Sequence, residues 1–290
     1  MPGTITVGVD GTDHSLAAAD WAAAEASRRD MALRLVHAWV WQPLDTPVAA
    51  DADVQRRWAA DVLREARERV TAAVPDLAVT AELLPAEAVP ALLSEAAEAD
   101  LLALGSRGHG TVVGHLLGSV ALKVLRQAVR PVVLVRPARR DGPGPAIDEV
   151  VVGVQEVDGT GGPVLEFAFA AAAARGARLR AVRAWSVPAV FAWSPGSLYL
   201  ADEAGGLERL ERERLSEALR PWREKYPRVE VVEHVGTGSA AEVLLSNASG
   251  AALMVVGRRL PGAHDLRRIG PVTHAALHHA PCPVAVVPYL

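Results

Sequence analysis

Short apolar runs and longer mixed segments alternate along this chain of 290 residues. The apolar runs are typical of buried parallel strands, because both faces of such strands are covered. The longer segments are rich in alanine or place charged and apolar residues at helical spacing, as amphipathic helices do. In the first half, strands are predicted at residues 4–10, 33–39, 79–84, 101–104 and 131–137, and helices at residues 14–29, 51–73, 87–97 and 120–128. This alternation predicts an α/β fold in which helices cover both faces of a parallel sheet.

The same succession of elements occurs a second time, which indicates an internal duplication. Gly8 corresponds to Gly153 and Trp39 to Trp185, at offsets of 145 and 146 positions. In the second half, strands are predicted at residues 149–155, 179–185, 229–235, 252–256 and 283–288, and helices at residues 163–175, 203–222 and 239–248. The offset changes only where connecting loops differ in length, so the repeat is a duplication and not a product of composition.

A segment of glycine, proline and charged residues separates the two copies. Residues 138–147 have this composition and form a predicted linker. The expected domains are therefore residues 1–138 and residues 147–290. A chain of 290 residues suits two domains of average size, and its 50% apolar content supplies a core for each.

Charge and composition narrow the classes of function. The formal net charge of −4 and the pI of about 6.1 argue against partners that are nucleic acids or membrane surfaces. No apolar stretch reaches the ~18 residues of a membrane span, and no signal peptide is visible. The single cysteine, Cys282, excludes an intrachain disulfide and is expected in the core. We therefore expect a soluble, cytoplasmic protein.

The most informative motif is a glycine-rich segment after the fourth predicted strand. Two residues separate Gly105 from Gly108, and nine separate Gly108 from Gly118-Ser119, which precedes a predicted helix. Glycines permit close backbone approach and positive φ. Free N–H groups and the dipole of a helix N-terminus favour an anion. The segment therefore predicts a phosphate site, in which His109 either contacts a phosphate or faces solvent.

These motifs resemble those of the universal stress protein family in its tandem-domain form. The resemblance rests on Val9-Asp10-Gly11, His37-Ala38-Trp39, Gly105-x2-Gly108-x9-Gly118-Ser119 and Arg130-Pro-Val-Val-Leu-Val-Arg-Pro137. It implies two tandem Rossmann-like domains of the adenine-nucleotide α-hydrolase type, each with a five-stranded parallel sheet of order 3-2-1-4-5. The glycine spacing marks the family's ATP-binding class, so the resemblance implies ATP, accompanied by Mg²⁺, as the ligand.

The family's ligand contacts carry over to the first half residue by residue. The implied contacts are Asp10 for the ribose, the backbone of Gly8 and Val9 beside it, Ala38 for the adenine, Gly105, Arg107 and Gly108 for the ribose and phosphates, and Gly118, Ser119 and Val120 for the terminal phosphates. Ser119 can offer both its hydroxyl and its N–H at the helix N-terminus. The resemblance implies no catalytic residue and no protein ligand for a metal.

The second half departs from this pattern at three places. Gln155 stands where the aspartate is expected, Leu260 where a glycine is expected, and Pro271 where the serine is expected. The first change removes a charged acceptor for ribose hydroxyls, and the second adds a branched side chain beside the phosphate. Proline removes a hydroxyl and an N–H donor together. We therefore expect one ATP per chain, held in the first half.

The leading interpretation is an ATP-binding regulatory protein of the stress response with an unidentified protein partner. One alternative is an enzyme that hydrolyses ATP slowly or transfers adenylyl groups, and the other is an interaction protein without nucleotide. The family also pairs fifth strands, and an unpaired edge strand invites such pairing. Residues 131–136 and 283–287 are therefore predicted to join the two halves as an intramolecular pseudo-dimer, while a homodimer of two chains stays open.

Overall fold

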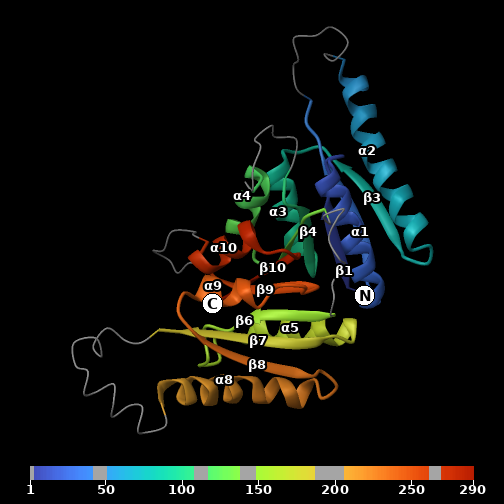
Figure 1. Ribbon diagram of the computed structural model, residues 1–290. Helices are drawn as coiled ribbons and strands as arrows, with labels where there is room; N and C mark the ends of the chain where they lie inside the picture. Colours follow the sequence, from blue (N-terminus) through green and yellow to red (C-terminus); the bar gives the residue numbers. More distant parts are fainter. Residues whose placement is uncertain (1–2, 42–50, 108–116, 138–147, 187–205, 261–268) are drawn as a thin grey trace. The chain divides into compact units, whose positions relative to one another are not determined.

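The chain folds into two compact units, each built around its own parallel sheet (Figure 1). The computed structural model describes residues 3–41, 51–107, 117–137, 148–186, 206–260 and 269–290. The two units confirm the predicted fold class. The domain limits of 1–138 and 147–290 fall at residues outside these ranges and stay a prediction, as does the pairing of the fifth strands.

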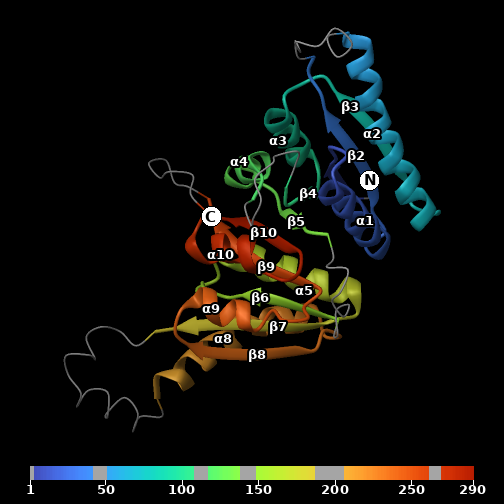
Figure 2. The same ribbon diagram turned by 45° about the horizontal axis from the view of Figure 1, so that its top comes forward.

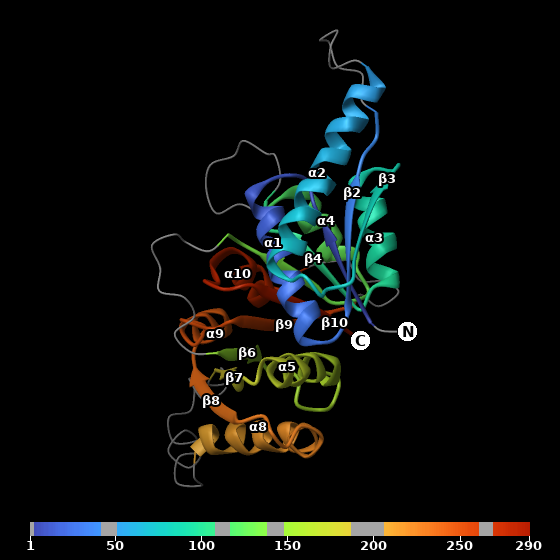
Figure 3. The same cartoon turned by 90° about the vertical axis from the view of Figure 1, so that its right-hand side faces the viewer.

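The first unit contains a sheet of order β3-β2-β1-β4-β5, the order that the family resemblance implies. Its strands are β1 (Thr4–Gly8), β2 (Ala32–Ala38), β3 (Val79–Leu84), β4 (Leu101–Gly105) and β5 (Val132–Val135), and every pair is parallel. Its helices are α1 (Asp13–Arg28), α2 (Ala52–Ala73), α3 (Ala88–Glu98) and α4 (Ser119–Gln127). Helices α1 and α2 pack together on one face, and α3 and α4 on the other (Figure 3).

The second unit repeats this arrangement with a sheet of order β8-β7-β6-β9-β10 (Figure 2). Its strands are β6 (Glu149–Gly153), β7 (Arg178–Trp185), β8 (Val231–Thr237), β9 (Leu253–Arg259) and β10 (Val284–Tyr289). Its helices are α5 (Gly162–Arg175), α8 (Gly206–Lys225), α9 (Ala240–Ser246) and α10 (Pro271–His279). The duplication seen in the sequence is therefore a duplication of the fold.

Each sheet supplies a dry core. Ile5 and Leu33 in the first unit, and Leu253 and Met254 in the second, are 0% exposed. Cys282 is buried, as expected. Among the helices in the described ranges, none is both long and apolar enough to cross a membrane.

The start of α1 explains how a helix comes to lie beside the carboxyl edge of the first sheet. The side chain of Thr12 accepts a hydrogen bond from the backbone N–H of Ser15 at 3.2 Å and so caps the helix. Gly8 at the end of β1 pairs in register with Val36 of β2 and Leu104 of β4. Because the strands are parallel, all three strands end at the same edge, where ligands of open α/β sheets bind.

Candidate functional site

A pocket of about 590 Å³ opens at the carboxyl ends of β1, β2 and β4. Of the residues predicted to bind the nucleotide, those that line it are Gly8, Val9, Asp10, Ala38, Gly105, Arg107, Gly118, Ser119 and Val120. Gly108 and His109 lie outside the described residues. The sequence-predicted residues therefore converge on one cavity, although they come from four separate segments of the chain.

Asp10 forms a tight turn between β1 and α1. Its Oδ1 accepts hydrogen bonds from the N–H of Thr12 at 3.1 Å and from the Thr12 hydroxyl at 2.6 Å. Gly11 between them has φ +81°, a conformation that favours glycine. The N–H of Asp10 donates to the hydroxyl of Ser15 at 3.1 Å. One carboxylate oxygen thus fixes the turn at the pocket, and the predicted contact to a ribose stays a prediction.

The loop after β4 is tied to the start of α4. The carbonyl of Ser106 accepts a hydrogen bond from the N–H of Gly118 at 2.9 Å, and the N–H of Ser106 donates to the carbonyl of Val135 at 2.9 Å. Helix α4 begins at Ser119, with Gly118 as its N-cap. The first N–H groups of a helix have no partner within the helix, so those of α4 can serve an anion at the pocket wall.

Gly105 is required for a different reason from the one that the sequence indicates. A Cβ on Gly105 would lie 2.6 Å from the carbonyl carbon of His14 and 2.8 Å from the N of Ser15. Neither Gly105 nor Gly118 has a positive φ. Of the two properties that glycine permits, close approach and not positive φ explains Gly105, which lets α1 approach β4.

His14 and Ser106 form a polar pair beside this loop that sequence reasoning missed. Nδ1 of His14 lies 3.0 Å from Oγ of Ser106. Burial and the positive charge of Arg107 lower the pKa of His14 from its usual 6.5, against the opposing effect of Asp13. A titratable side chain therefore lies beside the loop that follows β4. Ser106, however, is only 4% exposed and is not among the pocket-lining residues.

His37 lines the pocket, although the sequence analysis predicted no ligand contact for it. Its Nδ1 lies 2.7 Å from the carbonyl oxygen of Val9. Because a carbonyl oxygen can only accept, Nδ1 carries the proton and donates. His37 lies between Val36 and Ala38 on β2, and all three residues line the pocket. The tautomer of His37 is thus fixed by the end of β1.

Apolar side chains form the rest of the wall on the side of α3. They include Val36, Ala88, Leu92 and Leu104. A Cβ on Gly8 would lie 2.8 Å from both Leu92 Cδ2 and Leu104 Cδ2, so the absence of a side chain there lets these leucines close the base of the pocket. An apolar wall with polar groups at one end suits a flat, partly apolar ligand that carries a charged tail.

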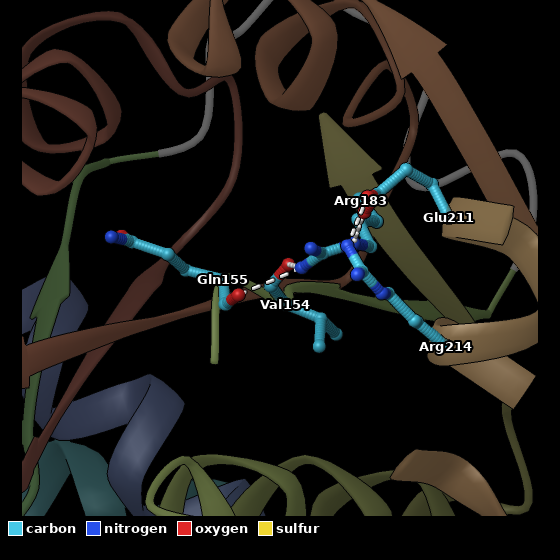
Figure 4. Close-up of polar contacts among 5 residues, drawn as sticks. All are labelled: Val154, Gln155, Arg183, Glu211 and Arg214. Atoms are coloured by element: carbon cyan, nitrogen blue, oxygen red, sulfur yellow. Dashed lines mark hydrogen bonds and ion pairs between the residues drawn. The ribbon is translucent and has the colours of Figure 1, made fainter. Parts of the chain in front are cut away.

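The corresponding edge of the second sheet is occupied by an arginine (Figure 4). Gly153 pairs with Val182 as Gly8 pairs with Val36, so Arg183 stands where His37 stands in the first unit. Its Nη1 donates to the carbonyl of Gln155 at 2.7 Å, and its Nε donates to Glu211 at 2.6 Å. The side chains of Arg183 and Glu211 are 12% and 13% exposed. A half-buried ion pair thus lies at the end of β6.

The aspartate turn of the first unit is kept in the second, but displaced. Oδ1 of Asp158 accepts hydrogen bonds from the N–H of Thr160 at 3.0 Å and from its hydroxyl at 2.7 Å. Gly159 has φ +98°, matching Gly11 in the first turn. Gln155 does replace Asp10 by position along the strand. The turn itself, however, is rebuilt three residues later.

Gly257 and Gly270 differ in the space that a side chain would find at each position. A Cβ on Gly257 would lie 2.7 Å from Tyr289 Cε1, whereas a Cβ on Gly270 would meet nothing within 4 Å. Neither residue has a positive φ. Turn geometry therefore does not require a glycine at either position. Packing against Tyr289 requires a glycine at position 257, whereas no steric contact requires one at position 270.

Two α/β units, each with a parallel sheet, and a pocket at the carboxyl edge of the first sheet define a tandem Rossmann-like protein. The model of the family described as "Universal stress protein family" matches residues 1–136 and 146–288. The chain belongs to the universal stress protein family.

Relatives of similar length support this assignment. One universal stress protein of Mycobacterium tuberculosis is 34% identical, over 97% of this chain and 96% of that protein. Another from the same species is 33% identical, over 97% and 95%. A solved universal stress protein of Archaeoglobus fulgidus has the same fold, with a TM-score of 0.70 at 17% identity over 98% of both chains. A solved universal stress protein in complex with cAMP aligns with 47% of this chain and 97% of its own, at 32% identity and a TM-score of 0.38.

Proposed function

We propose that the first half of this protein binds ATP with Mg²⁺, and that occupancy regulates the surface offered to a protein partner in the stress response. The observation that carries the proposal is the convergence of Asp10, Ala38, Gly105 and Ser119 on one pocket. Its volume of about 590 Å³ is in the range typical of small-molecule sites. A cytoplasmic location belongs to the same proposal.

The order of the strands supports a nucleotide that lies along the carboxyl edge of the sheet, from β2 across β1 to β4. Residue Ala38 ends β2, Asp10 follows β1, and Gly105 ends β4, so these residues lie on three adjacent strands. Adjacent strands are about 4.8 Å apart, so base, ribose and phosphates can each face one strand end. The phosphates then meet the N-terminus of α4, where the helix dipole and the Ser119 N–H favour negative charge.

The second half is proposed not to hold ATP in this way. Pro271 begins α10 and has no N–H to donate where Ser119 begins α4. Arg183 is engaged with backbone carbonyls and with Glu211 at the strand end. The missing N–H donor at Pro271 and the ion pair between Arg183 and Glu211 both favour a single ATP site per chain.

Calorimetric titration of the full chain with Mg-ATP tests the proposal. We expect about one ATP per chain. The N-terminus of α4 offers the N–H of Ser119 to a phosphate, whereas α10 begins at Pro271, which has no N–H to donate. Mass spectrometry of the denatured, purified protein separates the alternatives. Bound ATP supports the regulatory binding module, ADP alone supports slow hydrolysis, and a chain that neither carries nor binds nucleotide supports the interaction protein.

A further inference from the structure

We infer that His274 and His278 of α10 together bind a divalent transition-metal ion of the class of Zn²⁺, Ni²⁺ and Cu²⁺. The site is built from residues of the second unit alone. It is different from the Mg²⁺ that accompanies ATP in the proposed function, and it requires neither the pocket of the first unit nor a nucleotide.

The two histidines are neighbours on one side of α10. They are four positions apart, the spacing at which side chains of a helix meet. Their ring centroids lie 4.4 Å apart, and the ring planes are inclined at 35°. Two nitrogens that bind one Zn²⁺ lie at most about 4.2 Å apart, because each Zn–N bond is about 2.0–2.1 Å long. The rings are therefore already near the spacing that a shared ion needs, and rotation of the side chains can complete it.

The packing of α10 leaves this pair accessible. Thr273 and Ala276 are buried, and the hydroxyl of Thr273 donates to the carbonyl of Gly257 in β9 at 2.9 Å. His274, by contrast, is exposed, and His278 is half-buried. Other residues thus fix the helix, while an ion from solvent can reach the two imidazoles.

The position of the pair along α10 also favours a cation. His278 lies in the last turn of the helix, which ends at His279. The last carbonyl groups of a helix have no N–H partner within it and form the negative end of the helix dipole. A positive ion held by the last turn therefore gains a favourable interaction in addition to its two nitrogen ligands.

The chemistry of the donors determines the class of metal. Imidazole nitrogens suit Zn²⁺, Cu²⁺ and Ni²⁺, whereas Mg²⁺ and Ca²⁺ prefer oxygen ligands. Within the described ranges, no three His, Cys, Asp or Glu side chains form a group that could hold a metal ion. Structural zinc sites have four protein ligands. With two, the remaining positions belong to water, so the ion should exchange with solution.

His279 provides a matched comparison on the same helix. It is exposed and directly follows His278, but adjacent residues of a helix point apart. Its ring centroid lies 6.3 Å from that of His278, at an inclination of 50°. The spacing that suits a shared ion is thus found between His274 and His278 and not between the two adjacent histidines.

Calorimetric titration of the full chain with ZnCl₂, after removal of any nucleotide by dialysis, tests the inference. His274→Ala should weaken the tightest Zn²⁺ binding at least about tenfold, because it removes one of the two Zn–N bonds. His279→Ala is the control and should leave the affinity unchanged. Excess MgCl₂ should not displace the bound Zn²⁺, because Mg²⁺ prefers oxygen ligands.

Circular dichroism establishes that each variant is folded. If His274→Ala does not fold, imidazole ¹⁵N resonances of the wild-type protein serve instead. Those of His274 and His278 should shift with Zn²⁺, and that of His279 should not. The inference is overturned if the wild-type chain does not bind Zn²⁺, if folded His274→Ala binds it as tightly, or if His279→Ala weakens it equally. Because no nucleotide is present, none of these results bears on the proposed ATP site.

Discussion

Gly105 lies against the backbone of His14, at a distance that leaves no room for a side chain. A Cβ on Gly105 would come 2.6 Å from the His14 carbonyl carbon and 2.8 Å from its oxygen. Backbone atoms cannot rotate aside as a side chain can, so the clash has to be relieved by moving α1 or β4. The end of β4 and the first turn of α1 both carry pocket residues, so this contact fixes two sides of the pocket at once.

Gly105→Ala should lower the free energy of unfolding by about 1–3 kcal/mol, because overpacking displaces the elements in contact. Urea denaturation measures the change. The matched control is Gly270→Ala, because a Cβ there meets nothing within 4 Å and φ is −63°. We expect it to change stability by less than about 1 kcal/mol, since the weaker N-cap preference of alanine and the lower entropy of the unfolded chain offset each other. Equal effects of both substitutions would contradict the steric role of the His14 contact.

Ser119→Pro should weaken ATP binding at least about a hundredfold, because it removes two donors worth ~1.5–3 kcal/mol each toward a charged group. The fold should persist, because proline is accepted at the first helical position and Pro271 already begins α10. Titration calorimetry with Mg-ATP gives the affinity. The reciprocal variant Pro271→Ser is the control and should leave both affinity and stoichiometry unaltered. A folded Ser119→Pro protein with wild-type affinity would refute the position of the phosphates.

Stability should fall as the pH is lowered through 6.5, in part because of His14. Burial and Arg107 lower the pKa of His14 from 6.5, so below that pH the unfolded chain takes up a proton that the folded chain does not. The free energy of unfolding therefore decreases until the folded-state pKa is reached. His14→Gln keeps a polar side chain and should lose less stability than the wild type between about pH 7.5 and about pH 5.5. Parallel pH profiles for the two proteins, from urea denaturation, would show that His14 contributes nothing.

Arg183→Ala should destabilise the second unit by about 2–3 kcal/mol, since it removes the donor to Oε2 of the half-buried Glu211 and to the carbonyl of Gln155. Glu211 keeps its ion pair with Arg214 at 2.7 Å, which limits the loss. Arg212→Ala is the control, because Arg212 and Glu208 are 56% and 52% exposed. Such exposed pairs contribute at most about 1 kcal/mol. Chemical denaturation compares the two variants, and the stoichiometry of ATP should be the same in both.

The fold could be predicted because strand and helix patterns are local. The apolar run that became β4 and the alanine-rich segment that became α1 identify themselves without any knowledge of their neighbours. The pocket could be predicted in outline for a related reason. Its main residues follow strand ends, and the ends of parallel strands share one edge.

Contacts between distant segments could not be predicted in the same way. His14 and Ser106 are 92 residues apart and meet only because α1 folds back along β4. His37 looks like any polar residue at a strand end until its bond to Val9 fixes its tautomer. The turn at Asp158 lies 148 positions after that at Asp10, whereas Gly153 and Trp185 lie 145 and 146 positions after Gly8 and Trp39. Matching the repeats at those two residues therefore hides the displaced turn.

The steric demands on Gly105 and Gly257 bear on how a glycine motif is interpreted as a nucleotide site. In each unit a glycine of the fourth strand faces atoms of the protein itself: Gly105 faces His14, and Gly257 faces Tyr289. Such a glycine is therefore required for packing whether or not its domain holds a ligand. The presence of Gly257 and Gly270 therefore does not by itself indicate a nucleotide site in the second half. The residue that begins the following helix, serine in one half and proline in the other, is the better diagnostic position when the domains of relatives are sorted.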